Sequence, residues 1–202
     1  MGEKVESNKK QKKEALLNTA FDLFISKGIH KTSISDIADK AGVAKGTFYL
    51  YFKDKYDIRN KLISHKAGQL FLAAYSELKA AGISDFEEQI VFIAGYIIDC
   101  LDKDRSLLNF ISKHLSWGIF KNAMITSSEN AEENIYMIFD RLLKQSGHQF
   151  KDPEIMIFSM IEFVSGASYN TILYAQPVPI EAMKPYIFTV IRQIIRNHYI
   201  EV

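Results

Sequence analysis

The side chains best suited to bind another molecule lie within residues 34–52, ISDIADKAGVAKGTFYLYF. Apolar residues recur at helical spacing on both sides of Gly42, which predicts two short helices joined by a turn at that glycine. The outer side of the second helix carries Lys45, Gly46, Thr47 and Tyr49. A helix that presents hydrogen-bonding side chains on one exposed face can enter the major groove of DNA. The stretch therefore indicates a helix-turn-helix DNA-binding module.

Residues that flank these two helices could hold the DNA backbone. Ser33 and Asp36 have the spacing of a capping box, and a helix N-terminus beside Thr32 and Ser33 suits a phosphate oxygen. Lys55 starts the next helix, and loss of its charge should reduce the salt dependence of DNA binding by about one counterion. The predicted DNA contacts are Thr32, Ser33, Lys45, Gly46, Thr47, Tyr49, Tyr51 and Lys55.

Helical patterns continue through the rest of the chain, and no β pattern of useful length interrupts them. We expect helices over about residues 9–27, 54–80, 84–101, 105–115, 128–145 and 153–174, and a last helix to about residue 199 that Pro185 divides. Residues 1–8 are expected to be irregular, and residues 122–132 suggest no definite element. The sequence thus predicts an all-α protein of about nine helices. A three-helix DNA-binding domain over residues 1–55 would precede a helical ligand-binding and dimerisation domain over residues 56–202.

The distribution of charge agrees with this division. Residues 1–55 hold 11 lysines and 7 acidic residues, whereas the remainder holds 14 basic and 17 acidic residues. The first part is therefore net basic and the second net acidic, although the whole chain is close to neutral. Such a split fits a basic nucleic-acid-binding module joined to a body that does not touch phosphate.

Composition also disfavours several classes of protein. Cys100 is the single cysteine, which excludes an intrachain disulfide and a cysteine-rich zinc site. No apolar run approaches the roughly 20 residues that cross a bilayer, and the N-terminus lacks the apolar core of a signal peptide. We therefore expect a cytoplasmic protein with no membrane partner, no metal and no cofactor.

The segment FDLFISKGIHKTSISDIADKAGVAKGTFYLYFKDKYDI, residues 21–58, resembles the TetR family of bacterial transcriptional regulators. The KGTFYLYFKDK portion, residues 45–55, is the most specific part, whereas Ala44 departs from the serine that caps the recognition helix in many members. The resemblance implies that a homodimer places one recognition helix on each half-site of a palindromic operator in double-stranded DNA. It also implies a small-molecule pocket in the remainder of the chain.

The second half of the chain suggests where these two functions reside. The last two helices, about residues 153–175 and 185–199, are apolar on more than one side, which favours a four-helix dimer interface built from two helices of each subunit. Aromatic residues interspersed with polar ones favour a pocket for a mostly apolar ligand. The predicted pocket residues are Phe71, Tyr75, Phe92, Tyr96, Cys100, Phe110, His114, Trp117, Tyr136, Phe139, Phe163 and Tyr169.

These features favour a sequence-specific transcriptional regulator, and specifically a repressor that a small, mostly apolar ligand releases from its operator. A transcriptional activator and a helical protein-binding adaptor are the alternatives. An enzyme that uses Cys100 and His114 is a remote third interpretation, because the two lie on different predicted helices and no third partner is indicated. We therefore expect that the protein is not an enzyme.

Overall fold

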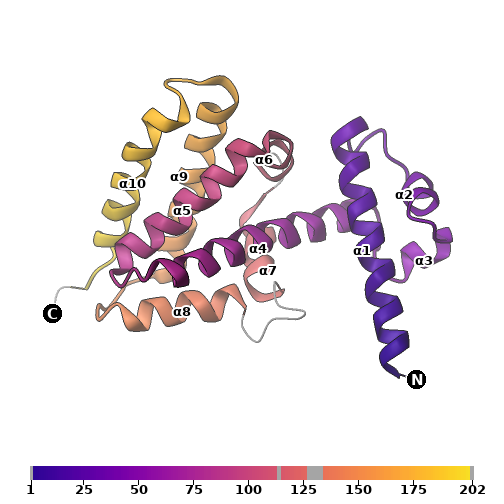
Figure 1. Cartoon of the computed structure of the whole chain (residues 1–202), viewed down its shortest axis with the longest axis horizontal. Helices are drawn as coiled ribbons and strands as arrows, with labels where there is room; N and C mark the ends of the chain where they lie inside the picture. The colour runs from indigo at the N-terminus through magenta and orange to yellow at the C-terminus, as the bar shows by residue number, and fades with distance from the viewer. Residues whose placement is uncertain (1, 113–114, 127–133, 201–202) are drawn as a thin grey trace. The chain divides into compact units, whose positions relative to one another are not determined.

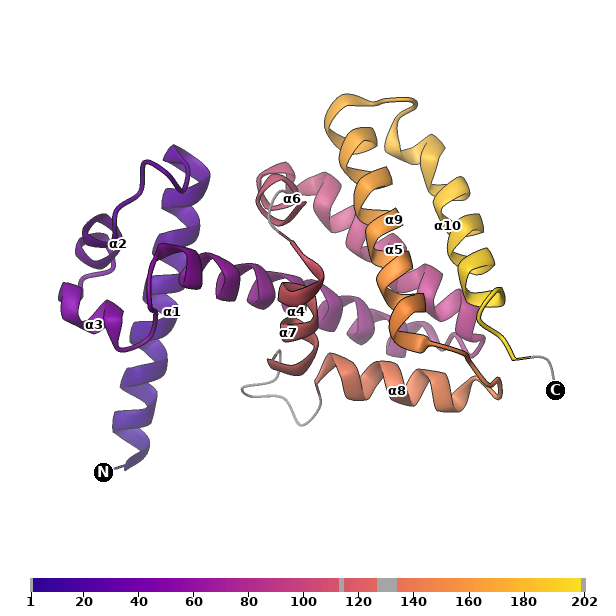
Figure 2. The ribbon, with the colours of Figure 1, turned by 180° about the vertical axis from the view of Figure 1, so that it is seen from behind.

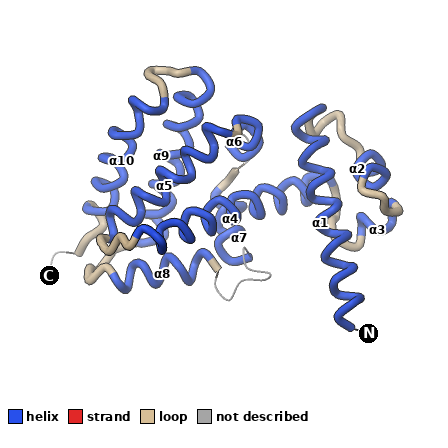
Figure 3. The backbone as a smooth tube through the Cα atoms, viewed as in Figure 1, coloured by secondary structure: helices blue, strands red, loops and turns tan. Residues whose placement is uncertain are grey.

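The computed structural model describes residues 2–112, 115–126 and 134–200, with side chains from residue 7 onward. Helices dominate this part of the chain, and the only β pairing within it is an isolated bridge between Phe150 and Tyr199 (Figures 1 and 3). The ten described helices are α1 (Gly2–Lys27), α2 (Ile34–Lys40), α3 (Lys45–Tyr49), α4 (Lys55–Ala81), α5 (Phe86–Lys103), α6 (Arg105–Ser112), α7 (Trp117–Thr126), α8 (Ile135–Gln145), α9 (Pro153–Tyr174) and α10 (Ile180–Arg196). The predicted all-α class is confirmed.

The chain folds as two compact units, residues 1–63 and residues 64–202. Helix α4 starts in the first unit and continues without a break into the second. The predicted domain boundary between residues 55 and 56 coincides with the start of α4 and stays a prediction.

The first unit is built around the buried faces of α1, α2 and α3. Helix α1 packs against α2, and α2 packs against α3. Gly28, with a φ of 81°, ends α1 in the left-handed conformation that glycine adopts without steric cost. The residues that fill this core are fully or nearly fully buried: Leu16, Leu17, Ala20, Phe24, Ile37, Ala38, Phe48, Phe52, Ile58 and Leu62.

The second unit packs α5, α9 and α10 against one another, with α6 beside α5 and α9 and with α8 beside α7 and α5 (Figure 2). Two arginines of α10 form ion pairs with α5. Arg192 Nε lies 2.8 Å from Glu88 Oε1, and Arg196 Nη2 lies 2.8 Å from Glu87 Oε2. These pairs fix the register of α10 along α5 on the surface of the apolar core.

Several predicted helix boundaries are wrong. Helix α1 begins at Gly2, so residues 2–8 are helical rather than irregular. Residues 117–126, for which the sequence suggested no helix, form α7. The described residues consequently form ten helices rather than about nine. Helix α8 begins after Asn134, whose side chain accepts a hydrogen bond from the Met137 N–H, and the predicted start near residue 128 lies outside the described residues.

The predicted division of the last helix at Pro185 is wrong. Helix α10 runs from Ile180 to Arg196 with Pro185 inside it. The proline lies in the second turn of the helix, so the bond that its missing N–H removes is close to an end where backbone groups are already partly unpaired.

Among the described helices, α9 is long and apolar enough to cross a membrane, judged by length and composition alone. Glu154 and Glu162 interrupt the apolar residues of this helix, so no unbroken apolar run marks it in the sequence. One third of the apolar window is buried against other parts of the protein, and α9 packs on both α6 and α10. The helix therefore contributes to the core of the second unit.

Candidate DNA-binding surface and ligand cavity

Helix α2 begins in a complete capping box, as its sequence predicts. Ser33 Oγ accepts a hydrogen bond from the Asp36 N–H at 3.1 Å, and Asp36 Oδ2 accepts one from the Ser33 N–H at 2.8 Å. Lys27 Nζ of α1 donates to the same carboxylate oxygen at 2.8 Å. The Lys27 contact, aided by the Ser33 N–H, lowers the pKa of Asp36 from 3.8 to about 2. One ionised carboxylate thus caps α2 and ties it to α1.

The turn after α2 returns the chain against that helix. Gly42 has a φ of 69°, and the Val43 N–H donates to Ala38 O at 3.0 Å. Ala44 occupies the N-cap position of α3 and makes no side-chain capping bond. Because α3 has only five residues, its position depends on packing rather than on its own helical stability.

The two sides of α3 differ sharply in exposure. Phe48 is fully buried, and its ring centroid lies 5.4 Å from that of Phe52. Lys45 and Gly46 are exposed, and Tyr49 is 53% accessible. A Cβ atom added at Gly46 would meet no other atom within 4 Å, so nothing inside the unit requires a glycine there. The exposed face combines a cation, a bare stretch of backbone and a phenol.

The other predicted contacts lie at the edges of this face. Ser33 is exposed, whereas Thr47 and Tyr51 are half-buried. Leu50, which the sequence analysis did not single out, is 79% exposed directly after α3. The exposure of Leu50 could not be predicted from the sequence, because apolar residues in or next to a short amphipathic helix are normally assigned to its buried side.

Thr32 and Lys55 make contacts inside the unit instead of presenting free polar groups. Thr32 is buried, and its hydroxyl donates to Gly28 O at 2.8 Å. Lys55 Nζ donates to three carbonyl oxygens, at 3.1, 3.3 and 3.4 Å, namely those of Ile29, His30 and Thr32. All three ammonium protons therefore have acceptors in the loop before α2. The predicted phosphate contacts from Thr32 and Lys55 stay predictions, and the sequence alone does not distinguish a lysine that holds a loop from one that binds an anion.

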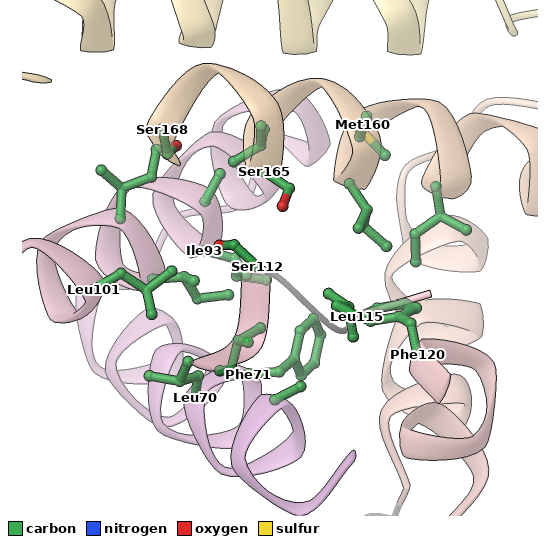
Figure 4. A pocket seen from close by; sticks show the side chains of 18 of the residues that line it. Leu70, Phe71, Ile93, Leu101, Ser112, Leu115, Phe120, Met160, Ser165 and Ser168 are labelled. Carbon is green, nitrogen blue, oxygen red and sulfur yellow. The ribbon is translucent and has the colours of Figure 1, made fainter. Parts of the chain in front are cut away.

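The second unit contains an apolar cavity of about 180 Å³ (Figure 4). Helices α4, α5, α6 and α9 supply most of its lining, with single residues from α7, α8 and α10. The lining residues are Ala67, Leu70, Phe71, Ile90, Ile93, Ala94, Ile97, Ile98, Leu101, Leu108, Ile111, Ser112, Leu115, Phe120, Phe139, Ile157, Met160, Ile161, Val164, Ser165, Ser168 and Ile191.

The structure brings only part of the predicted pocket set together. Phe71 and Phe139 line the main cavity, and Phe139 also borders a second hollow with Trp117 and Tyr136. His114 lies outside the described residues. The remaining predicted residues line neither hollow: Tyr75, Phe92, Tyr96, Cys100, Phe110, Phe163 and Tyr169.

The predicted pocket residues that line neither hollow make contacts elsewhere in the second unit. Tyr75 accepts a hydrogen bond from Arg141 Nη1 at 3.4 Å, and Tyr169 donates to Asn109 Oδ1 at 3.4 Å. The predicted lining consists of aromatic and polar side chains, whereas the observed lining is mostly aliphatic. An aliphatic lining carries the same helical periodicity as solid core, so the sequence offered no signal that could have separated the two.

The capped α2, the tight turn and the exposed face of α3 define a helix-turn-helix DNA-binding domain. Residues 16–62 match the family model described as "Bacterial regulatory proteins, tetR family". The resemblance to the TetR family of bacterial regulators that the sequence suggests is therefore confirmed for these residues.

The two curated relatives described next match over half of the chain or less. The chain is 31% identical over 99 residues to the fatty acid metabolism regulator protein of Bacillus subtilis (strain 168), an alignment that covers 49% of this chain and 50% of that protein. It is 32% identical over 77 residues to the transcriptional repressor KstR2 of Rhodococcus jostii (strain RHA1), covering 38% and 37%. The chain thus spans half or less of the length of these two relatives.

Solved structures extend the likeness of fold to both units. The fatty acid degradation regulator FadR from Bacillus halodurans aligns with a TM-score of 0.63 at 20% identity, covering 88% of this chain and 96% of that one. FadR from Bacillus subtilis, solved in complex with stearoyl-CoA, aligns with a TM-score of 0.62 at 19% identity over the same shares. Identities this low establish a common fold and nothing further.

The Lys55 clamp predicts a loss of stability when it is removed. Lys55→Ala should lower the free energy of unfolding of the first unit by about 1–3 kcal/mol, because three carbonyl acceptors lose a charged donor. Hydrogen exchange of α2 amides measures this change, with the exposed Lys53 as a matched control in Lys53→Ala. Unchanged exchange combined with a weaker salt dependence of DNA binding would instead assign Lys55 to phosphate.

The lowered pKa of Asp36 predicts a pH-dependent contribution to stability. Because the folded pKa of about 2 lies below the ordinary value of 3.8, the contribution is present above the ordinary value and is lost as the pH falls through the folded one. Asp36→Asn should therefore increase the hydrogen-exchange rate of α2 amides at neutral pH. The difference in exchange rate between the variant and the wild type should become smaller as the pH falls from about 4 to about 2. Asp39→Asn, on the exposed side of α2, should show neither effect. A difference independent of pH would contradict the ionic role.

Proposed function

We propose that this protein is a sequence-specific DNA-binding transcriptional regulator, and specifically a repressor that a small, mostly apolar ligand releases from a palindromic operator. The observation that carries the proposal is the face of α3 formed by Lys45, Gly46 and Tyr49, which is open to solvent and opposite the buried Phe48. Such a face fits the major groove, where a lysine and a phenol can reach base edges or phosphates. Ser33 and Tyr51 at its edges are the proposed contacts to the DNA backbone.

Binding to a palindrome requires two copies of the module, and we assign the contact between copies to α9 and α10. The outer side of α9 carries the exposed apolar residues Ile155, Phe158 and Tyr174, and Tyr186 of α10 is 68% accessible. Gly166 lies exposed on the same helix, and a Cβ atom there would meet nothing within 4 Å. A small residue amid apolar ones allows two helices to approach closely, which supports a homodimer through this surface.

The cavity supports release by a ligand. Ala67, Leu70 and Phe71 line it from α4, the helix whose first residue is Lys55 of the DNA-binding unit. A ligand that favours a different position of α4 would favour a dimer whose recognition helices are wrongly spaced for successive major grooves, about 34–36 Å apart. The regulators of fatty acid metabolism among the relatives support an apolar effector. The proposed regulator acts in the cytoplasm and catalyses no reaction.

The DNA-binding face predicts that folding and DNA binding can be separated by mutation. Gly46→Ala should leave the free protein equally stable, or up to about 1 kcal/mol more stable, because alanine favours the helix and meets no neighbour. The same change and Tyr49→Ala should weaken DNA binding on the order of tenfold by removing close backbone approach and a side-chain contact. Gel retardation of a palindrome upstream of the protein's own gene, at low salt, measures the DNA binding of both variants.

The control for this experiment is Lys103→Ala, which removes an exposed lysine from the second unit and should leave retardation unchanged. If the wild-type protein retards no such fragment at low salt, the proposal is wrong. If Gly46→Ala and Tyr49→Ala bind as tightly as wild type, α3 is not the recognition helix.

The proposed interface predicts the effect of a large side chain at its centre. Gly166→Arg should convert the dimer to a monomer without unfolding it, because the new side chain extends into open space in the single subunit. Sedimentation velocity measures the oligomeric state, and Ser76→Arg on the exposed side of α4 is the matched control. A variant that sediments as a dimer would place the interface elsewhere, and a monomeric wild type would contradict the dimer itself.

A further inference from the structure

The cavity of the second unit differs from most ligand sites in the absence of charge. Of its described lining residues, none is a lysine, arginine, histidine, aspartate or glutamate. Transfer of an isolated charge from water into such surroundings is strongly unfavourable unless a partner is present. The described lining therefore favours a molecule that is uncharged along the length that the cavity encloses.

Three serines supply the only polar side chains among the described lining residues. Ser165 and Ser168 lie one turn apart on α9, and Ser112 lies at the end of α6. Figure 4 shows all three side chains among the hydrocarbon groups of the lining. A molecule in the cavity would consequently meet hydroxyl groups from two helices.

Ser168 is the distinctive member of this group. It is 2% accessible, and among the described residues its Oγ is the one buried side-chain polar atom without a hydrogen-bond partner. Thr171, three residues later, satisfies its own hydroxyl by donating to Ala167 O at 2.8 Å. Since an unpaired buried hydroxyl is unfavourable, a ligand oxygen that pairs with Ser168 Oγ would form a hydrogen bond that the described residues alone do not provide.

The size of the cavity limits the ligand further. Its volume of about 180 Å³ slightly exceeds the ~150 Å³ of an engineered apolar cavity that binds benzene. The enclosed part of a ligand therefore has on the order of ten non-hydrogen atoms in this conformation.

We propose that the cavity binds an uncharged, mainly hydrocarbon molecule of medium length whose single hydroxyl or carbonyl oxygen forms a hydrogen bond with Ser168 Oγ. This assignment rests on the proposed function, for which it specifies the class of effector. It separates the protein from a regulator that binds the ionised or phosphorylated part of an acyl compound inside the cavity, because the described lining offers that part no cation.

A set of matched probes tests the assignment: 1-octanol, 1-octene, octanoate and octylammonium. They share an eight-carbon chain and differ in charge and hydrogen bonding. Binding to the full-length protein is followed by the ¹³C-methyl signal of Met160, which lines the cavity, and Met124, which borders only the second hollow, is the internal reference. We expect 1-octanol to bind at least about tenfold more tightly than either ion.

The role of Ser168 is tested by the ratio of 1-octanol to 1-octene affinity within each variant, so that small changes in stability cancel. Ser168→Ala should reduce this ratio about two- to tenfold, the range expected for one hydrogen bond. Ser159→Ala, on the same helix but outside the cavity lining, should leave it unchanged.

Tighter binding of octanoate or octylammonium than of 1-octanol would overturn the uncharged class, and an unchanged ratio in Ser168→Ala would overturn the hydrogen bond. Absence of a Met160 response to all four probes would overturn the assignment as a whole. None of these outcomes depends on DNA, so gel retardation by the same preparation separates a failure here from a failure of the proposed function.

Discussion

The burial of Phe48 is the interaction on which the DNA-binding face depends. Helix α3 has five residues and no side-chain cap, so it cannot hold its orientation alone. Phe48 is fully buried beside Phe52, and this contact fixes which side of the short helix faces solvent. The exposure of Lys45, Gly46 and Tyr49 is therefore a consequence of core packing. Chemistry at this surface and stability of the first unit are set by opposite sides of the same short helix.

The first unit was largely predictable from the sequence because its signals are local. The capping box of Ser33 and Asp36, the left-handed Gly42 and the inward Phe48 are each encoded within a few residues. The roles of Thr32 and Lys55 were not predictable, since their partners are backbone carbonyls of a loop that precedes α2. The residue type alone does not show whether a lysine after a recognition helix binds the carbonyl oxygens of a loop or a phosphate of DNA.

The cavity was not predictable, and the reason is physical. A cavity is a difference between the volume that side chains fill and the volume that helices enclose, and helical periodicity records only which side is apolar. Phe110 and Tyr169 have the expected residue types but pack elsewhere, whereas Ile93 and Leu101, which look like ordinary core, line the hollow. Ser168 could not have been singled out, because a serine in an apolar helix usually bonds to its own backbone.

The ion pairs between α5 and α10 have a consequence for the assembly. Helix α5 provides several lining residues, α10 provides Ile191, and the proposed contact between subunits includes α10. Arg192 and Arg196 join α10 to α5 through Glu88 and Glu87, so the ion pairs connect the helix that supplies much of the cavity wall to a helix of the proposed subunit contact. In the proposed homodimer, a ligand that shifts α5 would therefore also shift α10 at the contact with the second subunit, which is the physical requirement for coupling between the two cavities.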